Sequence, residues 1–278
     1  MIDKTSPQVS AIIPTYNRGW VLREAIDSVL AQTYPRLELI VVDDGSSDDT
    51  PSILTAYGEQ LRTLRQPNRG VSAARNAGVA AARGELIAFL DSDDLWLPEK
   101  ITAQIDYFQE HPQSWICQTQ ELWIRRGRRV NPKQRHRKAG GMIFMRSLEL
   151  CLVSPSAVML RRELLERVGG FDEALPACED YDLWLRISCR YPVGLIDRPL
   201  IQKRGGHEDQ LSAQAGLDRY RIQSLSKILD AGILTSNQRQ AAIRVLRAKC
   251  AIYAAGCRKR GRLREAAGYE SLSANYQP

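Results

Sequence analysis

Apolar residues occur in short, nearly continuous runs along the first third of the chain. The runs at 9–14 (VSAIIP), 37–42 (LELIVV) and 85–90 (ELIAFL) predict buried strands, and 61–64 predicts a weaker one. Strands that are apolar at almost every position are typical of a sheet covered on both faces. We therefore expect several strands at the centre of a layered fold.

The segments between these runs have the spacing of helices. Apolar residues recur every three or four positions over 21–32 and 53–57, and the Ala-rich segment 70–84 favours a helix that ends at its last glycine. Strands that alternate with helices predict an α/β fold built on a parallel sheet.

The remaining pattern is less regular. It predicts helices over 99–110, after Pro98, and over 178–191, strands over 114–124, 154–162 and 192–200, and basic helices beyond 216. We therefore expect one α/β unit over residues 1–215 and a basic helical extension over 216–278.

Composition fits a globular protein that remains inside the cell. Of the 278 residues, 44% are hydrophobic, and no apolar run approaches the roughly 18–20 residues of a membrane span. The first ten residues lack the apolar segment of a signal peptide. The six cysteines form no C-x-x-C pair, which favours buried, reduced thiols over disulfides or zinc ligands. We expect a soluble, cytoplasmic protein.

Positive charge is concentrated in two segments. The net charge is +7; residues 125–138 hold eight Lys or Arg and no acid, and 231–264 hold nine more and no acid. Such a surplus favours an anionic partner, which is phosphate, a lipid surface or nucleic acid.

Polar clusters follow three of the predicted strands. They are PTYN at 14–17, DDGS at 43–46 and DSDD at 91–94. Ligands of open α/β sheets collect at the carboxyl ends of strands. Each cluster alone is also compatible with turn or helix-capping chemistry. Three carboxylates within four residues exceed what a cap needs, so DSDD predicts a divalent cation, Mn²⁺ or Mg²⁺, that holds a diphosphate.

The ordered series of motifs resembles a known family. PTYN, VVDDGSSDDT, NRGVSAARNAG, FLDSDD and GGFDE…CEDYDLWLR together look like a family 2 glycosyltransferase with the GT-A fold, over about residues 8–205. This resemblance implies a mostly parallel, Rossmann-like sheet with helices on both faces. It also implies transfer of a sugar from a nucleotide-diphosphate sugar with inversion at the anomeric carbon.

The resemblance also implies roles for individual residues. The residues that match donor-binding positions are Pro14, Thr15, Tyr16 and Asp44 around the base, Arg75 at the nucleotide, and Asp91, Ser92 and Asp93 in the metal-binding D-x-D, which Asp94 extends. Which of the aspartates contacts the metal directly stays open.

Asp180, in the CEDYD segment, matches the position of the catalytic base. Its alternative role is to favour a helix N-terminus together with Glu179. His207 matches a position that can complete the metal site, and its alternative is a solvated loop residue. Trp96 and Trp184 suit stacking on a sugar acceptor or packing in the core, and we expect the core.

The family's processive members carry a Q-x-x-R-W motif, which is absent here. We therefore expect transfer of one sugar, and not chain extension, from a UDP-sugar donor. The resemblance implies a glycan or lipid-linked acceptor in surface polysaccharide assembly, and the basic segments favour peripheral contact with an anionic membrane.

Three other functions stay open from the sequence. A nucleic-acid-binding protein would need aromatic residues for base stacking, and 125–138 has none. A GT-A-like nucleotidyltransferase would need a Gly-rich loop where PTYNRG stands. A catalytically silent nucleotide-sugar binder would carry the same motifs. The donor sugar, the oligomeric state and the role of 216–278 are not determined by the sequence.

Overall fold

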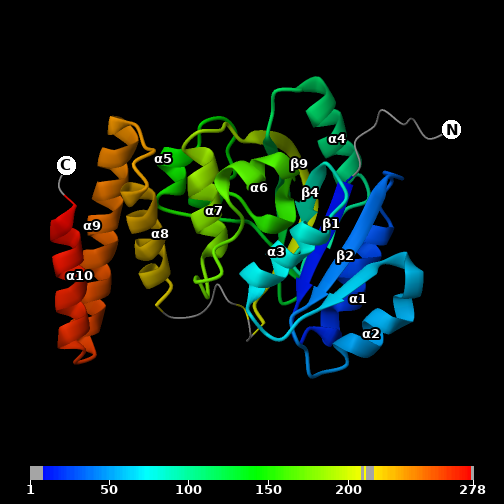
Figure 1. The fold of residues 1–278 in the computed structure, drawn as a ribbon, viewed down its shortest axis with the longest axis horizontal. Helices are drawn as coiled ribbons and strands as arrows, with labels where there is room; N and C mark the ends of the chain where they lie inside the picture. Colours follow the sequence, from blue (N-terminus) through cyan, green and yellow to red (C-terminus); the bar gives the residue numbers. More distant parts are fainter. Residues whose placement is uncertain (1–8, 208–209, 211–215, 277–278) are drawn as a thin grey trace.

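A computed structural model describes residues 9–207, 210 and 216–276 (Figure 1). Within this part of the chain the strands form one nine-stranded sheet. Its strands are β1 (Val9–Thr15), β2 (Leu37–Asp43), β3 (Arg62–Arg65), β4 (Leu86–Phe89), β5 (Leu95–Trp96), β6 (Ile116–Arg125), β7 (Arg128–Val130), β8 (Val158–Arg161) and β9 (Gly194–Gly205).

Helices connect and cover these strands. They are α1 (Gly19–Leu30), α2 (Thr50–Tyr57), α3 (Val71–Ala81), α4 (Lys100–Glu110), α5 (Phe144–Ser147), α6 (Arg162–Val168), α7 (Glu179–Ser188), α8 (Asp218–Asp230), α9 (Ser236–Lys259) and α10 (Leu263–Asn275). Short 3₁₀ turns lie at η1 (Gly58–Gln60), η2 (Gln134–His136) and η3 (Pro155–Ala157).

The sheet has the strand order β3-β2-β1-β4-β8-β6-β9-β5, and β7 pairs with the outer part of β6. The neighbours β3, β2, β1 and β4 are all parallel, as the alternating pattern predicts. Beyond β4 the sheet is mixed, because β8 runs antiparallel to both β4 and β6, whereas β9 is parallel to β6. The α/β fold class with a mostly parallel core is confirmed.

Helices cover both faces of the sheet, as its apolar strands predict. Consecutive residues of β1 point to opposite faces: Ile13 packs in a core with α1, α2 and α4, whereas Ile12 packs in a core with α3, α6 and α7. Trp96 and Trp184 are 3% and 2% exposed and lie in these two cores, which confirms the expectation that they pack in the core.

The C-terminal helices pack against the rest of the fold through a third core. Apolar residues of α8, α9 and α10 surround Tyr181 and Leu185 of α7, together with Phe144 and Leu148. Figure 1 shows these three helices standing side by side at one end of the molecule, next to α5 and α7. The predicted division at 215–216 remains a prediction, since residue 215 lies outside the described residues.

Two predicted elements have different bounds in the structure. The predicted strand over 154–162 begins as the turn η3 and becomes β8 only at Val158, because Pro155 has no N–H to donate to a ladder. The last predicted strand, 192–200, continues to Gly205 as β9. This extension carries the chain across the carboxyl ends of the central strands.

The cysteines and the helices bear on two further expectations. Cys117, Cys189, Cys250 and Cys257 are buried free thiols, as predicted, whereas Cys151 and Cys178 are half-buried. Among the described helices, none has the length and apolarity to cross a bilayer.

Candidate active site

The DSDD turn follows β4 after one residue, Leu90, and its three carboxylates have different partners. Asp94 N donates to Asp91 O at 2.9 Å, which closes the turn. Asp91 Oδ1 accepts from Arg75 at 2.7 Å, and Asp93 Oδ2 lies 2.8 Å from His207 Nε2. Each of these two carboxylates therefore has its own cationic or imidazole partner, supplied by a distant part of the sequence.

Asp94 holds the turn against the neighbouring loop and strand. It is 2% exposed, and its two oxygens accept from Ser156 Oγ at 2.6 Å and from Arg204 N at 2.8 Å. Burial, followed by the charge of Asp93, raises the pKa of Asp94 well above its usual value. Both oxygens of Asp94 thus accept hydrogen bonds within the protein. Direct binding of a metal by Asp94 remains a prediction.

Arg75 joins the DSDD turn to the start of α7. Its guanidinium is 3% exposed and donates at 2.7 Å to Asp91 and at 2.6 Å to Glu179. It also lies over the ring of Phe171, 5.0 Å from the ring centre. Burial acts to lower the pKa of Arg75, but the two carboxylates outweigh it and raise that pKa. Both terminal nitrogens of Arg75 thus donate to carboxylates, and its contact with a nucleotide remains a prediction.

Asp180 occupies the first turn of α7. Cys178, just before the helix, has φ +61°, a left-handed conformation that costs a non-glycine residue about 1–2 kcal/mol. Asp180 is half-buried; its Oδ1 accepts from Tyr181 N at 2.7 Å, and its Oδ2 accepts from Cys151 Sγ at 3.5 Å. Asp180 thus lies at the N-terminus of α7 with one oxygen bonded to a backbone N–H.

The predicted base-binding residues lie at the ends of β1 and β2. Thr15 and Pro14 are buried, whereas Tyr16 is 47% exposed at the surface. Asp44 is 3% exposed and accepts from Gln66 Nε2, Arg69 N and Gly70 N at 2.7–2.9 Å. It thereby fixes the loop that leads into α3. The remaining predicted donor residue, Ser92, is 7% exposed in the turn.

His207 and Asp93 are the predicted metal ligands that meet directly. Their side chains are 16% and 20% exposed, and Trp20 packs edge-on against His207 with ring centres 5.6 Å apart. Over residues 9–207, 210 and 216–276, no group of three or more His, Cys, Asp or Glu side chains is arranged around one point. A carboxylate and an imidazole at hydrogen-bond distance suit Mn²⁺ or a similar cation, so this pair fits a divalent metal as two of its ligands.

One loop, residues 150–157, was missed as a functional segment by the sequence reasoning. Ser156 accepts from Asp91 N and donates to Asp94, Ser154 Oγ accepts from Lys203 Nζ at 3.4 Å, and Cys151 contacts Asp180. The Ser-Pro-Ser sequence is the one local signal that this segment turns before it extends. The loop 150–157 therefore contacts both the DSDD turn and Asp180.

Lys203 of β9 has no signal in the sequence, yet it faces the acidic groups of the site. Burial acts to lower its pKa, but Glu121, Asp94, Asp91 and Asp180 outweigh burial and raise the pKa of Lys203. The site thus balances its carboxylates with fixed cations, among them the buried Arg75 and the half-buried Lys203.

Comparison with known families and proteins agrees with this arrangement. Residues 10–169 match the model of "Glycosyl transferase family 2". An uncharacterized glycosyltransferase of Rickettsia typhi is 36% identical over 76% of this chain and 67% of its own length. Four further rickettsial relatives are covered over 31% to 58% of their lengths.

A relative with a named activity is the Escherichia coli UDP-Glc:alpha-D-GlcNAc-diphosphoundecaprenol beta-1,3-glucosyltransferase WfgD. It is 34% identical over 64% of this chain and 69% of its own length.

Solved structures share the fold. The S. aureus TarS 1–349 complex with UDP-GlcNAc has a TM-score of 0.70 at 22% identity, over 86% of this chain and 72% of TarS 1–349. The mannosyltransferase PcManGT from Pyrobaculum calidifontis, in complex with GDP-Man and Mn²⁺, has a TM-score of 0.61 at 21% identity, over 98% of this chain and 81% of its own.

Proposed function

Since the chain belongs to glycosyl transferase family 2, we propose that it transfers a single sugar, with inversion, from a UDP-sugar to a hydroxyl group. The proposed acceptor is a glycan or a lipid-linked sugar in surface polysaccharide assembly, and the proposed cofactor is Mn²⁺ or Mg²⁺.

The observation that carries this proposal is the double ion pair of Arg75. One buried guanidinium binds Asp91 of the acidic turn and Glu179, the residue before Asp180. The predicted donor site and the predicted base are therefore held together by one side chain. This supports the proposal because an inverting transfer needs the donor and the base close together, so that the acceptor oxygen can attack the sugar as the diphosphate departs.

Asp180 acts as the base in this proposal. An acceptor hydroxyl is a weak nucleophile, and a positioned carboxylate takes its proton as the new C–O bond forms. The backbone N–H of Tyr181 fixes one oxygen of Asp180, which leaves the half-buried carboxylate oriented in a defined direction.

Asp93 and His207 would hold the metal, with Asp91 next to them in the turn. The bound cation would offset negative charge on the departing diphosphate. Lys203 supplies a fixed positive charge on the same side of the site. A UDP-sugar is favoured because the name of WfgD includes UDP-Glc and TarS was solved with UDP-GlcNAc.

Two variants test the roles of the aspartates. Asp180→Asn is expected to lower kcat by about 10²–10⁴-fold, the usual contribution of a general base, and to leave binding of UDP unchanged. Asp93→Asn is expected to weaken binding of UDP in the presence of Mn²⁺. Turnover is measured as release of UDP, and binding as the rise in melting temperature with UDP and Mn²⁺.

Normal turnover in Asp180→Asn would remove the assignment of the base. Release of pyrophosphate from a nucleoside triphosphate would instead favour a nucleotidyltransferase, and binding of UDP-sugars without any transfer or hydrolysis would favour a silent binder.

The C-terminal helices suggest where the enzyme works. Lys259, Arg260 and Arg264 are exposed near the end of α9 and the start of α10, close in sequence to Leu263, which is 66% exposed. Cations beside an exposed apolar side chain favour peripheral contact with anionic lipid. We expect sedimentation with vesicles that contain anionic lipid, and equal binding to neutral vesicles would contradict this.

A further inference from the structure

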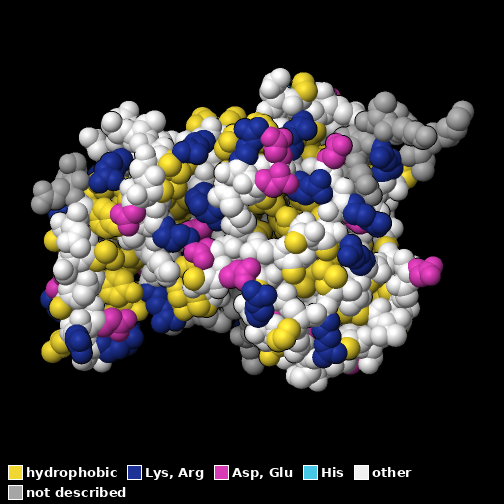
Figure 2. Space-filling view, viewed as in Figure 1, with side chains coloured by type: hydrophobic (Ala, Val, Ile, Leu, Met, Phe, Trp, Pro, Cys, Tyr) yellow, Lys and Arg dark blue, Asp and Glu magenta, His cyan; other side chains and the backbone are white. Residues whose placement is uncertain are grey.

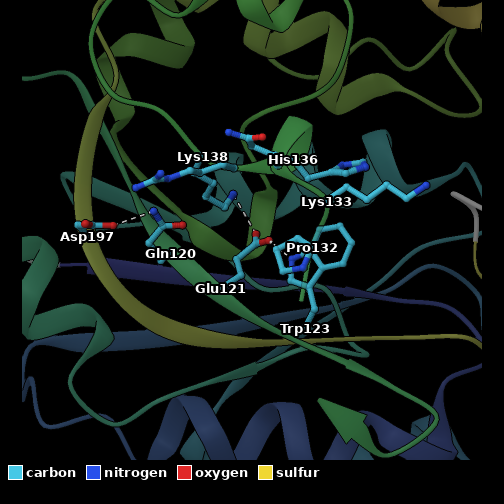
Figure 3. A pocket seen from close by; sticks show the side chains of 10 residues that line it. Gln120, Glu121, Trp123, Pro132, Lys133, His136, Lys138 and Asp197 are labelled. Atoms are coloured by element: carbon cyan, nitrogen blue, oxygen red, sulfur yellow. Dashed lines mark hydrogen bonds and ion pairs between the residues drawn. The ribbon is translucent and has the colours of Figure 1, made fainter. Parts of the chain in front are cut away.

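A cavity of about 330 Å³ lies between the outer part of β6 and the basic segment 125–138 (Figure 3). Its floor comes from Gln120, Glu121 and Trp123 of β6, and segment 132–138 forms the opposite wall. Figure 3 shows Asp197 of β9 at one end of the cavity and the rings of Trp123 and Pro132 at the other. The motifs of the proposed donor site do not contribute to this cavity.

The cavity carries more positive than negative charge, and its carboxylates are already engaged. Glu121 Oε1 pairs with Lys138 Nζ at 2.9 Å, and Asp197 accepts from Gln120 Nε2 at 2.8 Å. Lys133 and Arg137 also line the cavity, and no carboxylate of the described residues pairs with either side chain. Two cationic groups are therefore available for a ligand.

Burial, followed by the charges of Arg135 and Lys133, lowers the pKa of His136 in the cavity wall. Positive potential therefore dominates this wall even where its histidine is neutral.

Contacts link the inner end of the cavity to the candidate base. Lys138 Nζ donates to Leu152 O at 3.5 Å, and the next residue towards the N-terminus, Cys151, contacts Asp180 Oδ2. Lys203, which faces Asp180, is the register partner of Trp123 across β6 and β9. Lys138 in the cavity wall is therefore connected to Asp180 through the adjacent residues Leu152 and Cys151.

The aromatic part of the wall suits a sugar. Trp123 is half-buried, its Nε1 donates to Glu121 at 3.0 Å, and its ring lies 5.4 Å from that of His136. Sugars present C–H groups that pack on an aromatic ring, while their hydroxyls bond to polar neighbours.

We propose that this cavity binds the phosphate group of a phosphorylated sugar acceptor. Lys133 and Arg137 hold the phosphate, Trp123 packs against the sugar, and the acceptor hydroxyl reaches Asp180. This inference rests on the proposed function, since it assigns the acceptor of the same reaction. A lipid diphosphate sugar and a sugar-phosphate polymer both offer this chemistry.

The test compares two double variants of the same basic segment. Lys133→Ala/Arg137→Ala removes the two cations of the cavity, whereas Arg128→Ala/Arg129→Ala removes two exposed cations of β7 that do not line it. Both variants lose the same charge, so a diffuse attraction affects them equally. All four side chains are exposed, and melting temperatures check that the variants fold.

Binding of glucose 1-phosphate is measured by calorimetry with the donor site saturated by UDP and Mn²⁺. Lys133→Ala/Arg137→Ala removes two charge-assisted hydrogen bonds to the phosphate, so it is expected to bind glucose 1-phosphate at least about tenfold more weakly than the wild type does. Arg128→Ala/Arg129→Ala is expected to bind within about twofold of the wild type, as is usual for exposed charges outside a site. Methyl glucoside, which lacks the phosphate, is expected to bind more weakly to the wild type than glucose 1-phosphate does.

Equal losses in the two variants, or equal binding of methyl glucoside and glucose 1-phosphate, would overturn the proposal. Tighter binding of a random RNA oligomer than of glucose 1-phosphate would also overturn it. Two further probes distinguish the source: tighter binding of an alkyl glycosyl diphosphate indicates a lipid acceptor, and tighter binding of a glycerol-phosphate oligomer indicates a polymer.

Failure of the proposed function is seen separately. It appears as the absence of any UDP-dependent rise in the melting temperature of the wild type, whereas failure of the cavity proposal leaves that rise intact.

Discussion

The two halves of the sheet build their parts of the site in different ways. In the half formed by β3, β2, β1 and β4, polar residues follow parallel neighbouring strands, and Asp44 takes its partners from the nearby loop before α3, although the DSDD turn takes some of its partners from farther along the chain. In the half formed by β8, β6 and β9, the contacting groups come from loops and strands far apart in sequence, such as Cys151 with Asp180.

Charge follows the same division. The turn at the end of β4 has fixed partners for its three carboxylates, whereas the cavity beside β6 keeps cations that no described carboxylate binds. The first half is therefore preorganised around its own charges, and the second half retains charge for a ligand. Figure 2 shows Lys and Arg side chains over much of one face of the molecule, with Asp and Glu interspersed among them.

The largest expected effect comes from cutting the link between the halves. Arg75→Met leaves the carboxylates of Asp91 and Glu179 without their buried partner, and breaking such a pair costs about 3–5 kcal/mol of unfolding free energy. Urea denaturation measures the loss. Arg75→Lys keeps the charge but not both bonds, so it is expected to lose less stability and to retain part of the turnover.

If Arg75→Met unfolds at the same urea concentration as the wild type, the ion pairs of Arg75 do not hold the two halves together, and packing alone does so.

A smaller loss of stability is expected at acid pH, and it arises from Glu121 in the second half of the sheet. Burial acts to raise the pKa of Glu121, but Lys138 and Lys203 outweigh it and lower that pKa to about 2 from 4.5. Because the pKa is lower in the folded than in the unfolded chain, the stabilisation is present above about pH 4.5 and is lost as the pH falls towards 2. The loss amounts to at most about 3 kcal/mol.

The measurement is the free energy of unfolding between pH 5 and pH 2.5, about the window that this pKa shift defines. Glu121→Gln is less stable at neutral pH, since it leaves Lys138 buried without a countercharge, but its stability is expected to change less over the acid range. Parallel curves for the two proteins would show that other carboxylates account for the acid sensitivity.

The smallest effect is expected at Cys151. Its thiol is a weak donor 3.5 Å from Asp180, so Cys151→Ala is expected to lower kcat by only about twofold, with KM for the donor unchanged. A loss as large as that of Asp180→Asn would mean that the loop 150–157 positions the base far more strongly than its contacts indicate.

The sequence predicted the first half of the site well because its signals are local. Continuous apolar runs located β1, β2 and β4, and the polar residues after each run necessarily meet at one edge of a parallel sheet. The pairing of Asp93 with His207 also matches the expectation that both lie at one place, although their metal-binding role remains a prediction.

The second half could not be read in this way. Ser156 stood inside a predicted strand, and Lys203 lay just after the predicted strand 192–200. Both acquire their roles only when β9 pairs with β6 and the loop 150–157 contacts the DSDD turn. Arg75 was expected at a nucleotide, and its link to Glu179 depends on a contact across 104 positions of sequence. Such contacts are set by the tertiary fold and leave no periodic trace in the chain.

The C-terminal helices pack around the helix that begins with Asp180. Tyr181 and Leu185 are buried among them, and Lys227 of α8 donates at 2.8 Å to Asp182. The tail thus serves as a buttress for the proposed base, and a chain shortened before α8 would leave that helix without support on one side. A surface that binds α8–α10 would therefore act on the helix that carries Asp180, so binding of the tail and turnover are expected to be coupled.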